Sequence, residues 1–243
     1  MKAAILTDIH GNAPALQAVL SDIDQQGDIE QLFCLGDMIG IGPYSNEVIE
    51  MLYSREHMTA IAGNHEEAVL HLLEGRGPLK GHKELQEHHE WVGRQLSEES
   101  IKLIQRLPKS IDKEVEGQHV LLTHYHMSDN KLDDIDREPS GVKLDAKYKE
   151  TSYDLICFGH YHILHYFRTA QRVYMNPGAL GCNEFAVARY GIAEFHKDRL
   201  DVKFTAVTYD NRQYLQAYER LNVPNKDFIL KAFHGNQLDK EVQ

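Results

Sequence analysis

Short apolar runs of strand length recur along this chain, and five of them are followed closely by Asp, Asn or His. The runs, with the residues that follow, are 3–6 with Asp8 and His10, 32–34 with Asp37, 60–62 with Asn64 and His65, 120–122 with His124, and 155–158 with His160 and His162. A single Asp after a strand is usually a turn residue or a helix cap. Five such strands instead indicate one shared site, because the carboxyl ends of parallel strands open onto the same edge of a sheet.

Apolar residues between the first three runs recur at helical spacing. The pattern predicts strands at 2–7, 32–35 and 59–62, a helix capped by Asn12, and a second helix at 46–53. Strand–helix–strand units of this length imply parallel strands joined by right-handed crossovers. From Ile111 onward, short strands separated by tight turns predict an antiparallel or mixed second sheet.

The chain is predicted to form one domain spanning residues 1–243. Within this domain we expect a helical insertion at about 66–108 and a C-terminal helical extension at about 211–243. Residues 128–152 are polar and charged, which predicts a surface segment beside the site.

The charge of the chain argues against one class of partner. The formal net charge is −11 and no block of basic residues occurs, so a binder of long duplex nucleic acid is not expected. No apolar run approaches the ~20 residues of a membrane span, and the N-terminus has no signal-peptide pattern, so we expect a cytoplasmic protein without a membrane partner. The three cysteines form no close-spaced motif and are expected to be reduced.

The polar residues after the strands form an oxygen and imidazole set without thiolates. This set suits Mn, Fe, Zn or Mg better than a structural zinc site rich in cysteine. It comprises Asp8, His10, Asp37, Asn64, His124, His160 and His162. Seven ligands are too many for one first-row ion, whereas a central carboxylate can bridge two ions ~3.5–4 Å apart.

The same residues, taken in order, resemble the sequence blocks of the calcineurin-like metallophosphoesterase superfamily. The matching blocks are Asp8-x-His10, Gly36-Asp37, Gly63-Asn64-His65-Glu66, His124 and Gly159-His160-x-His162. The resemblance extends to about Gly181, because residues 176–179 are similar to the Asn-Pro-Gly-Ser segment of the family. It implies an α/β (α+β) fold, a four-layer αββα sandwich of two mixed β-sheets flanked by helices.

The resemblance also implies a role for each matching residue. One divalent ion would be held by Asp8, His10 and His162, the other by Asn64, His124 and His160, with Asp37 as the bridge. A hydroxide shared by two ions, with Mn or Fe favoured over Zn or Mg, would be the nucleophile. His65 would either protonate the leaving alkoxide or stabilise the phosphoryl oxygens.

Departures from the family pattern narrow the expected substrate. The Ser/Thr protein phosphatases and the symmetrical diadenosine tetraphosphatases carry Arg-Gly downstream of Gly-Asp, and the protein phosphatases add an Asp that orients the catalytic His. Gly40 and Ile41 stand at those places here, which disfavours both groups. Residues 36–50 instead resemble a bacterial branch of small phosphodiesterases and nucleotide phosphatases. That branch continues with a Gly-Gln-Pro-Arg loop, where this chain has different residues at 181–185.

We therefore expect a dinuclear metal-dependent phosphoesterase that hydrolyses a small phosphodiester or a nucleotide. Two alternatives are an asymmetric dinucleoside polyphosphate (diadenosine tetraphosphate) hydrolase and a non-catalytic scaffold of the same fold; a homo-oligomer is left open. The candidate substrate contacts are Asn12, Tyr125, His126, Phe185 and Arg189. The remaining histidines are predicted to be surface or helix-face residues: His57, His71, His82, His88, His89, His119, His165, His196 and His234.

Overall fold

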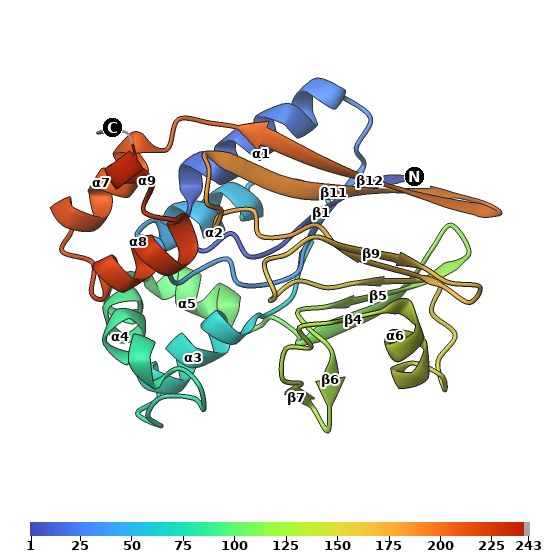
Figure 1. Cartoon of the computed structure of the whole chain (residues 1–243), viewed down its shortest axis with the longest axis horizontal. Helices are drawn as coiled ribbons and strands as arrows, with labels where there is room; N and C mark the ends of the chain where they lie inside the picture. The colour runs from blue at the N-terminus through green and yellow to red at the C-terminus, as the bar shows by residue number, and fades with distance from the viewer. Residues whose placement is uncertain (241–243) are drawn as a thin grey trace.

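Two five-stranded sheets pack face to face between layers of helices (Figure 1). The computed structural model describes residues 1–240 of the chain, and the side chains of residues 1–238. The first sheet has the strand order β12-β11-β1-β2-β3 and the second has the order β4-β5-β8-β10-β9. The predicted fold class, two mixed sheets flanked by helices, is confirmed.

The strands of each sheet combine parallel and antiparallel pairs. The first sheet contains β1 (Lys2–Leu6), β2 (Gln31–Cys34), β3 (Met58–Ala60), β11 (Val187–His196) and β12 (Arg199–Thr208). The second contains β4 (Ser110–Val115), β5 (Gln118–Thr123), β8 (Leu155–Cys157), β9 (His165–Arg168) and β10 (Val173–Asn176). In the first sheet β1, β2 and β3 are parallel, and in the second β5, β8 and β10 are parallel. A short hairpin, β6 (Met127–Ser128) and β7 (Lys131–Leu132), stands apart from both sheets.

The helices cover the outer faces of the sheets and one end of the sandwich (Figure 1). They are α1 (Ala13–Gln26), α2 (Ser45–Tyr53), α3 (Asn64–Leu73), η1 (Lys83–Leu85), α4 (Gln86–Gln95), α5 (Glu98–Ile104), α6 (Gly141–Lys147), α7 (Arg212–Arg220), α8 (Lys226–His234) and α9 (Gln237–Lys240). As predicted, the side chain of Asn12 caps α1 by accepting a hydrogen bond from the amide of Ala15. Over residues 1–240, no helix combines the length and the apolar character needed to cross a membrane.

Strand β1 shows why the parallel strands are largely apolar. Its alternate residues Ala3 and Ile5 pack between the two sheets, beside Phe33 of the neighbouring strand. Ala4 and Leu6 point to the opposite face, where they pack against the helices. Because both faces are buried, the strand has no solvent side and needs no polar alternation.

The segment 128–152 is not purely a surface stretch, as its polar sequence suggested. It contains α6, and Leu144 and Tyr148 are buried against the outer face of the second sheet, beside Ile156 and Tyr174. A helix of two turns with so few apolar anchors among charged residues gives too weak a periodicity to recognise from sequence.

The two helical regions outside the sandwich meet at the carboxyl ends of the strands. Helix α4 packs on α3, and α7 and α8 lie beside α4 at the left of Figure 1. Tyr214 of α7 and Ile229 of α8 share an apolar cluster with Ile41 and Cys182, which belong to loops at this edge. These helices therefore roof the edge to which the parallel strands point.

Candidate metal centre

Five of the seven candidate ligands have a left-handed backbone conformation. Their φ angles are 53° for Asp8, 51° for His10, 52° for Asp37, 67° for His160 and 62° for His162. A residue other than glycine rarely adopts this conformation, which costs on the order of 1 kcal/mol or more. Such strain persists only where the surrounding structure imposes it, and its concentration in these loops points to a functional site.

Glycine residues let the loops that carry these ligands approach one another more closely than any residue with a side chain would permit. A Cβ atom added to Gly63 would collide with the carboxylate of Asp37, and one added to Gly40 would lie 2.6 Å from Nδ1 of His65. Gly40 also has a φ of +78°, which favours glycine. Glycine at both positions lets the loop after β2 pass directly against the residues that begin α3.

The first group of donors brings two imidazole nitrogens and a carboxylate together. Nε2 of His10 lies 3.0 Å from Nε2 of His162. The carboxylate oxygen Oδ1 of Asp8 lies 3.7 Å from the first nitrogen and 3.4 Å from the second. Nδ1 of His10 faces the carbonyl oxygen of Ile39 at 3.4 Å, so the proton belongs there and Nε2 presents a lone pair. This arrangement suits a divalent cation.

The second group is centred on Nε2 of His124. This nitrogen lies 2.9 Å from Oδ1 of Asn64 and 3.2 Å from Oδ2 of Asp37, while Nδ1 donates to the carbonyl oxygen of Leu35. A ring nitrogen of His160 completes the group, within 4.8 Å of the donor atoms of Asp37 and His124. Oδ2 of Asp37 is also 3.8 Å from Nε2 of His10. Asp37 thus stands between the two groups, and the donors fit two divalent ions.

The buried charges of the metal-free protein compensate one another. Burial acts to raise the pKa of Asp37, but the charge and hydrogen bond of His124 outweigh it and hold this pKa well below its usual range. For His124, burial acts to lower the pKa, yet Asp37 and Asp8 raise it to about 10. A buried imidazolium therefore supplies the positive charge that the carboxylates require without bound ions.

Metal binding should release a proton from this site. At pH 8 the raised pKa of His124 keeps its imidazole protonated in the metal-free protein, and coordination requires the neutral ring. We expect about one proton per chain to leave on binding Mn²⁺, and the apparent affinity to rise with pH up to about pH 10. Titration calorimetry in buffers of different ionisation enthalpy measures this release; a binding heat independent of the buffer would contradict it.

Glu66 is a residue whose role the sequence motif left unassigned. It is fully buried, and its carboxylate accepts hydrogen bonds from the amides of Asp37, Met38, Ile39 and Gly63 at 2.7–3.1 Å. One side chain therefore ties the loop that carries Asp37 to the start of α3. The signal available in the sequence was its place three residues into a helix, where Glu commonly caps.

His65 lies beside both donor groups. Its backbone amide donates to Oδ1 of Asp37 at 2.9 Å, and its ring lies 4.8 Å from that of His10. Its Nδ1 is hydrogen-bonded to Nε2 of His89 at 2.9 Å. Burial lowers the pKa of His65 well below its usual range, so the ring is neutral. A neutral imidazole beside the proposed ions can act as a hydrogen-bond donor.

The remaining histidines were predicted to be surface or helix-face residues, and three of them lie on helix faces that are buried rather than exposed. His88, His89 and His234 are buried, and His82 is half-buried with its ring 5.5 Å from that of His65. Two of these histidines belong to α4, which packs on α3, and the third belongs to α8, which packs on α7. Packing between these helices buries side chains that would be exposed on an isolated helix. His57 is exposed, as predicted.

Three of the candidate substrate contacts are engaged inside the protein. Asn12 accepts from the amide of Ala15 and donates to the carbonyl of Gly181 and to the hydroxyl of Tyr209, which leaves its side chain no group for a substrate. Tyr125 and His126 are buried, and each makes a hydrogen bond within the chain. We therefore remove Asn12 from the proposed contacts and assign packing roles to the other two.

Arg189 and Phe185 remain candidates, and α8 adds Phe233. Phe185 is 66% exposed, in the loop before β11. Nε of Arg189 is buried without a hydrogen-bond partner in the part of the chain that the structure describes. The ring of Phe233 lies 5.8 Å from that of His162, so it forms a wall of the site. The sequence did not single out this residue, because one aromatic on an amphipathic helix usually belongs to a core.

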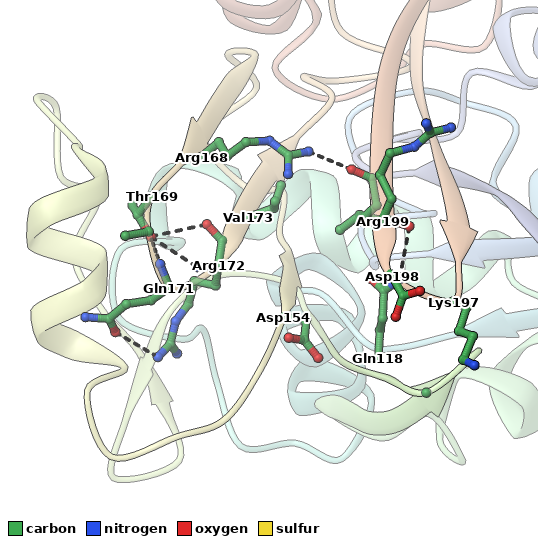
Figure 2. Close-up of a pocket in the computed structure, with 13 residues that line it drawn as sticks. Gln118, Asp154, Arg168, Thr169, Gln171, Arg172, Val173, Lys197, Asp198 and Arg199 are labelled. Atoms are coloured by element: carbon green, nitrogen blue, oxygen red, sulfur yellow. Dashed lines mark hydrogen bonds between the residues drawn. The ribbon is translucent and has the colours of Figure 1, made fainter.

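A polar cavity of about 380 Å³ lies at the opposite ends of the strands (Figure 2). Two of its basic residues are already engaged: Arg168 donates to the carbonyl of Leu200, and Arg172 turns toward Gln171 and donates to the backbone of Tyr148. Nothing here repeats the convergence of carboxylate, amide and imidazole donors, so we place the chemistry at the carboxyl ends.

An αββα sandwich with acidic, amide and imidazole donors at the ends of its parallel strands defines a class of metal-dependent hydrolases. Residues 1–198 match the model of the calcineurin-like phosphoesterase superfamily domain. The chain therefore belongs to this superfamily and is a phosphoester hydrolase.

Individual proteins are also similar to this chain, in sequence or in fold. The uncharacterized protein MJ0912 of Methanocaldococcus jannaschii is 26% identical over 243 residues, covering 90% of each chain. The crystal structure of hypothetical protein PH1004 from Pyrococcus horikoshii superposes with a TM-score of 0.82 at 21% identity, covering 96% of this chain and 98% of that one. A metallophosphoesterase from Sphaerobacter thermophilus gives a TM-score of 0.70 at 23% identity, covering 92% and 95%. At these identities the two structures show the shared fold.

Proposed function

We propose that this protein is a dinuclear metal-dependent phosphoesterase that hydrolyses a small phosphodiester or nucleotide. The observation that carries the proposal is the position of Asp37, whose Oδ2 lies 3.2 Å from Nε2 of His124 and 3.8 Å from Nε2 of His10. A carboxylate shared by two donor groups is what a two-metal phosphoryl-transfer site requires.

Each side chain has a defined task in this proposal. Asp8, His10 and His162 hold one ion, while Asn64, His124 and His160 hold the other. Two divalent ions would supply positive charge for the phosphoryl oxygens and a water activated as nucleophile. Nδ1 of both His10 and His124 faces a backbone carbonyl, which fixes the ring orientation that presents Nε2 to the ion. His65 serves the leaving group or a phosphoryl oxygen.

The donor set supports Mn or Fe as the ions, and Zn or Mg can also bind to oxygen and imidazole. Elemental analysis of freshly purified protein distinguishes them. Cys34, Cys157 and Cys182 are buried and free, which supports a reducing, cytoplasmic location.

Several features support a small substrate. The net charge of −11 gives no long-range attraction to a polyanion. The ring of Phe233 lies 5.8 Å from that of His162 and offers an aromatic face to a base. Arg189 stays a proposed contact for a phosphate oxygen, through its guanidinium group.

Chelation followed by metal restoration tests the proposed function. Treatment with EDTA should abolish hydrolysis of bis-p-nitrophenyl phosphate, and Mn²⁺ added in excess should restore it, because every proposed step needs charge at the two donor groups. Hydrolysis that ignores both chelator and metal would refute the proposal. A protein that binds two ions and hydrolyses no phosphoester would be a scaffold.

A panel of nucleotides analysed by chromatography then defines the substrate. Selective asymmetric cleavage of diadenosine tetraphosphate would identify the dinucleoside polyphosphate hydrolase, and broad cleavage of small phosphodiesters would identify the phosphodiesterase.

A further inference from the structure

A hydrogen bond joins the proposed catalytic histidine to a second buried histidine on another helix. Nδ1 of His65 lies 2.9 Å from Nε2 of His89, and the two rings meet edge to face with centroids 4.9 Å apart. His89 is 1% exposed and comes from α4, within the helical region that follows α3. Nothing in the reaction described above uses it.

The surroundings of His89 decide which ring donates the hydrogen. Nδ1 of His89 is buried and has no partner among the described residues. A neutral imidazole carries one N–H, and a buried N–H without an acceptor is rarer and costlier than an unused lone pair. The proton of His89 is therefore on Nε2, where it is donated to Nδ1 of His65. The proton of His65 must then be on its own Nε2.

This bond also determines the charge of His65. An imidazolium carries hydrogen on both nitrogens, so Nδ1 of His65 can accept from His89 only while the ring of His65 is neutral. A neutral imidazole that gave its Nε2 proton away completely would become an imidazolate. It can instead donate a hydrogen bond from Nε2 without losing the proton.

The hydrogen-bond partner of His65 comes from α4 because the loop after β2 has no side chain to offer at this point. A Cβ atom at Gly40 would lie 2.6 Å from Nδ1 of His65, so only a glycine fits there. A carboxylate from such a loop would accept from Nδ1–H and favour the charged ring. His89 donates to the same nitrogen and has the opposite effect.

We propose that His89 is a positioning residue that holds His65 as the neutral tautomer protonated on Nε2, so that His65 stabilises a phosphoryl oxygen by donating a hydrogen bond. The proposal rests on the proposed phosphoesterase function and selects one of the two roles considered for His65. No proton transfer from His65 is involved, and the departing alkoxide takes its proton from water.

A third metal site is the main rival explanation, because ring nitrogens of His65, His82 and His89 lie within 4.8 Å of one another. Histidine ligands normally donate their other ring N–H to an acceptor, as His10 and His124 do to backbone carbonyls. Nδ1 of His82 and Nδ1 of His89 are both buried without a partner in the described chain. A hydrogen bond explains the contact better than an ion does.

The test compares variants of His89 in the metal-loaded enzyme. His89→Leu should lower kcat for bis-p-nitrophenyl phosphate by about 10–100-fold, the usual effect of losing an orienting partner, with little change in KM and with both ions retained. His89→Gln, which can still donate to Nδ1, should recover part of the rate. His65→Ala/His89→Leu should be no slower than His65→Ala, because the second residue acts through the first. His88→Leu, a neighbouring buried histidine without a bond to His65, is the matched control.

A second measurement determines the tautomer of His65 directly, without an activity assay. Nitrogen-15 NMR of the zinc-loaded wild-type protein should show the proton of His65 on Nε2 and not on Nδ1. A proton on Nδ1, an unchanged kcat in His89→Leu, a multiplicative loss in the double variant, or a third ion lost with His89 would each overturn the proposal. If the wild-type protein hydrolyses no phosphodiester, the proposed function fails. The NMR result would still show whether His89 donates its hydrogen bond to Nδ1 of His65.

Discussion

Replacement of His65 by alanine should lower kcat by about 10²–10³-fold while both ions stay bound. This loss is typical of removing one hydrogen-bond donor that stabilises developing charge on an oxyanion. His65 contributes no ligand in the proposed centre, and its backbone amide, which donates to Asp37, remains in the variant. Elemental analysis and steady-state kinetics on the same preparation measure the two effects together.

The leaving group separates the two roles that His65 could have. If His65 stabilises a phosphoryl oxygen, the alanine variant should lose the same factor with p-nitrophenyl and with alkyl phosphodiesters. A proton donor would be needed much more by the alkyl leaving group, whose alkoxide is more basic. A wild-type rate in the variant would remove His65 from the reaction altogether.

Replacement of Asp37 by asparagine should reduce the metal content from two ions per chain to one or fewer. The substitution keeps the shape of the side chain but removes the negative charge that lies between His10 and His124. Since bound metal contributes several kcal/mol to the stabilisation of transition-state charge, activity should fall by about 10³-fold or more. Metal titration and hydrolysis of bis-p-nitrophenyl phosphate measure both consequences.

A surface carboxylate provides the control for this variant. Asp134→Asn removes an exposed charge and should leave metal content and rate unchanged. Thermal unfolding of the metal-free proteins shows whether Asp37→Asn keeps its fold. Two bound ions and full activity in a folded Asp37→Asn protein would show that Asp37 does not bridge the ions.

The central parallel strands were largely predictable because they are mostly buried on both faces. A run such as Leu155–Cys157 has no solvent side, so its apolar character is continuous and visible in the sequence. Strands β11 and β12, of ten residues each, are longer than the short strands that the sequence predicts for this part of the chain. Much of β12 alternates between half-buried and exposed residues such as Lys203. With so few apolar residues, the sequence does not show where such a strand begins and ends.

The arrangement of the candidate ligands was predictable for a related reason. Each ligand follows its own strand by a few residues, so the pairing of β1 with β2 brings Asp8 and Asp37 to one edge of the first sheet. The packing of the second sheet on the first then brings His124, which follows β5, beside Asp37. The histidines of α4 could not be assigned in the same way. Helical periodicity identifies a buried face, but it does not show which other element that face will meet.

By itself, the sequence determined the fold class and the set of metal-competent side chains, because both depend on short segments whose apolar runs and glycines act locally. Only the tertiary structure decided what surrounds that set. The contacts of His89 with His65 and of Phe233 with His162 depend on how α4 and α8 pack over the strand ends. That packing is built from apolar contacts of low specificity between segments far apart in the chain, and no local pattern encodes them.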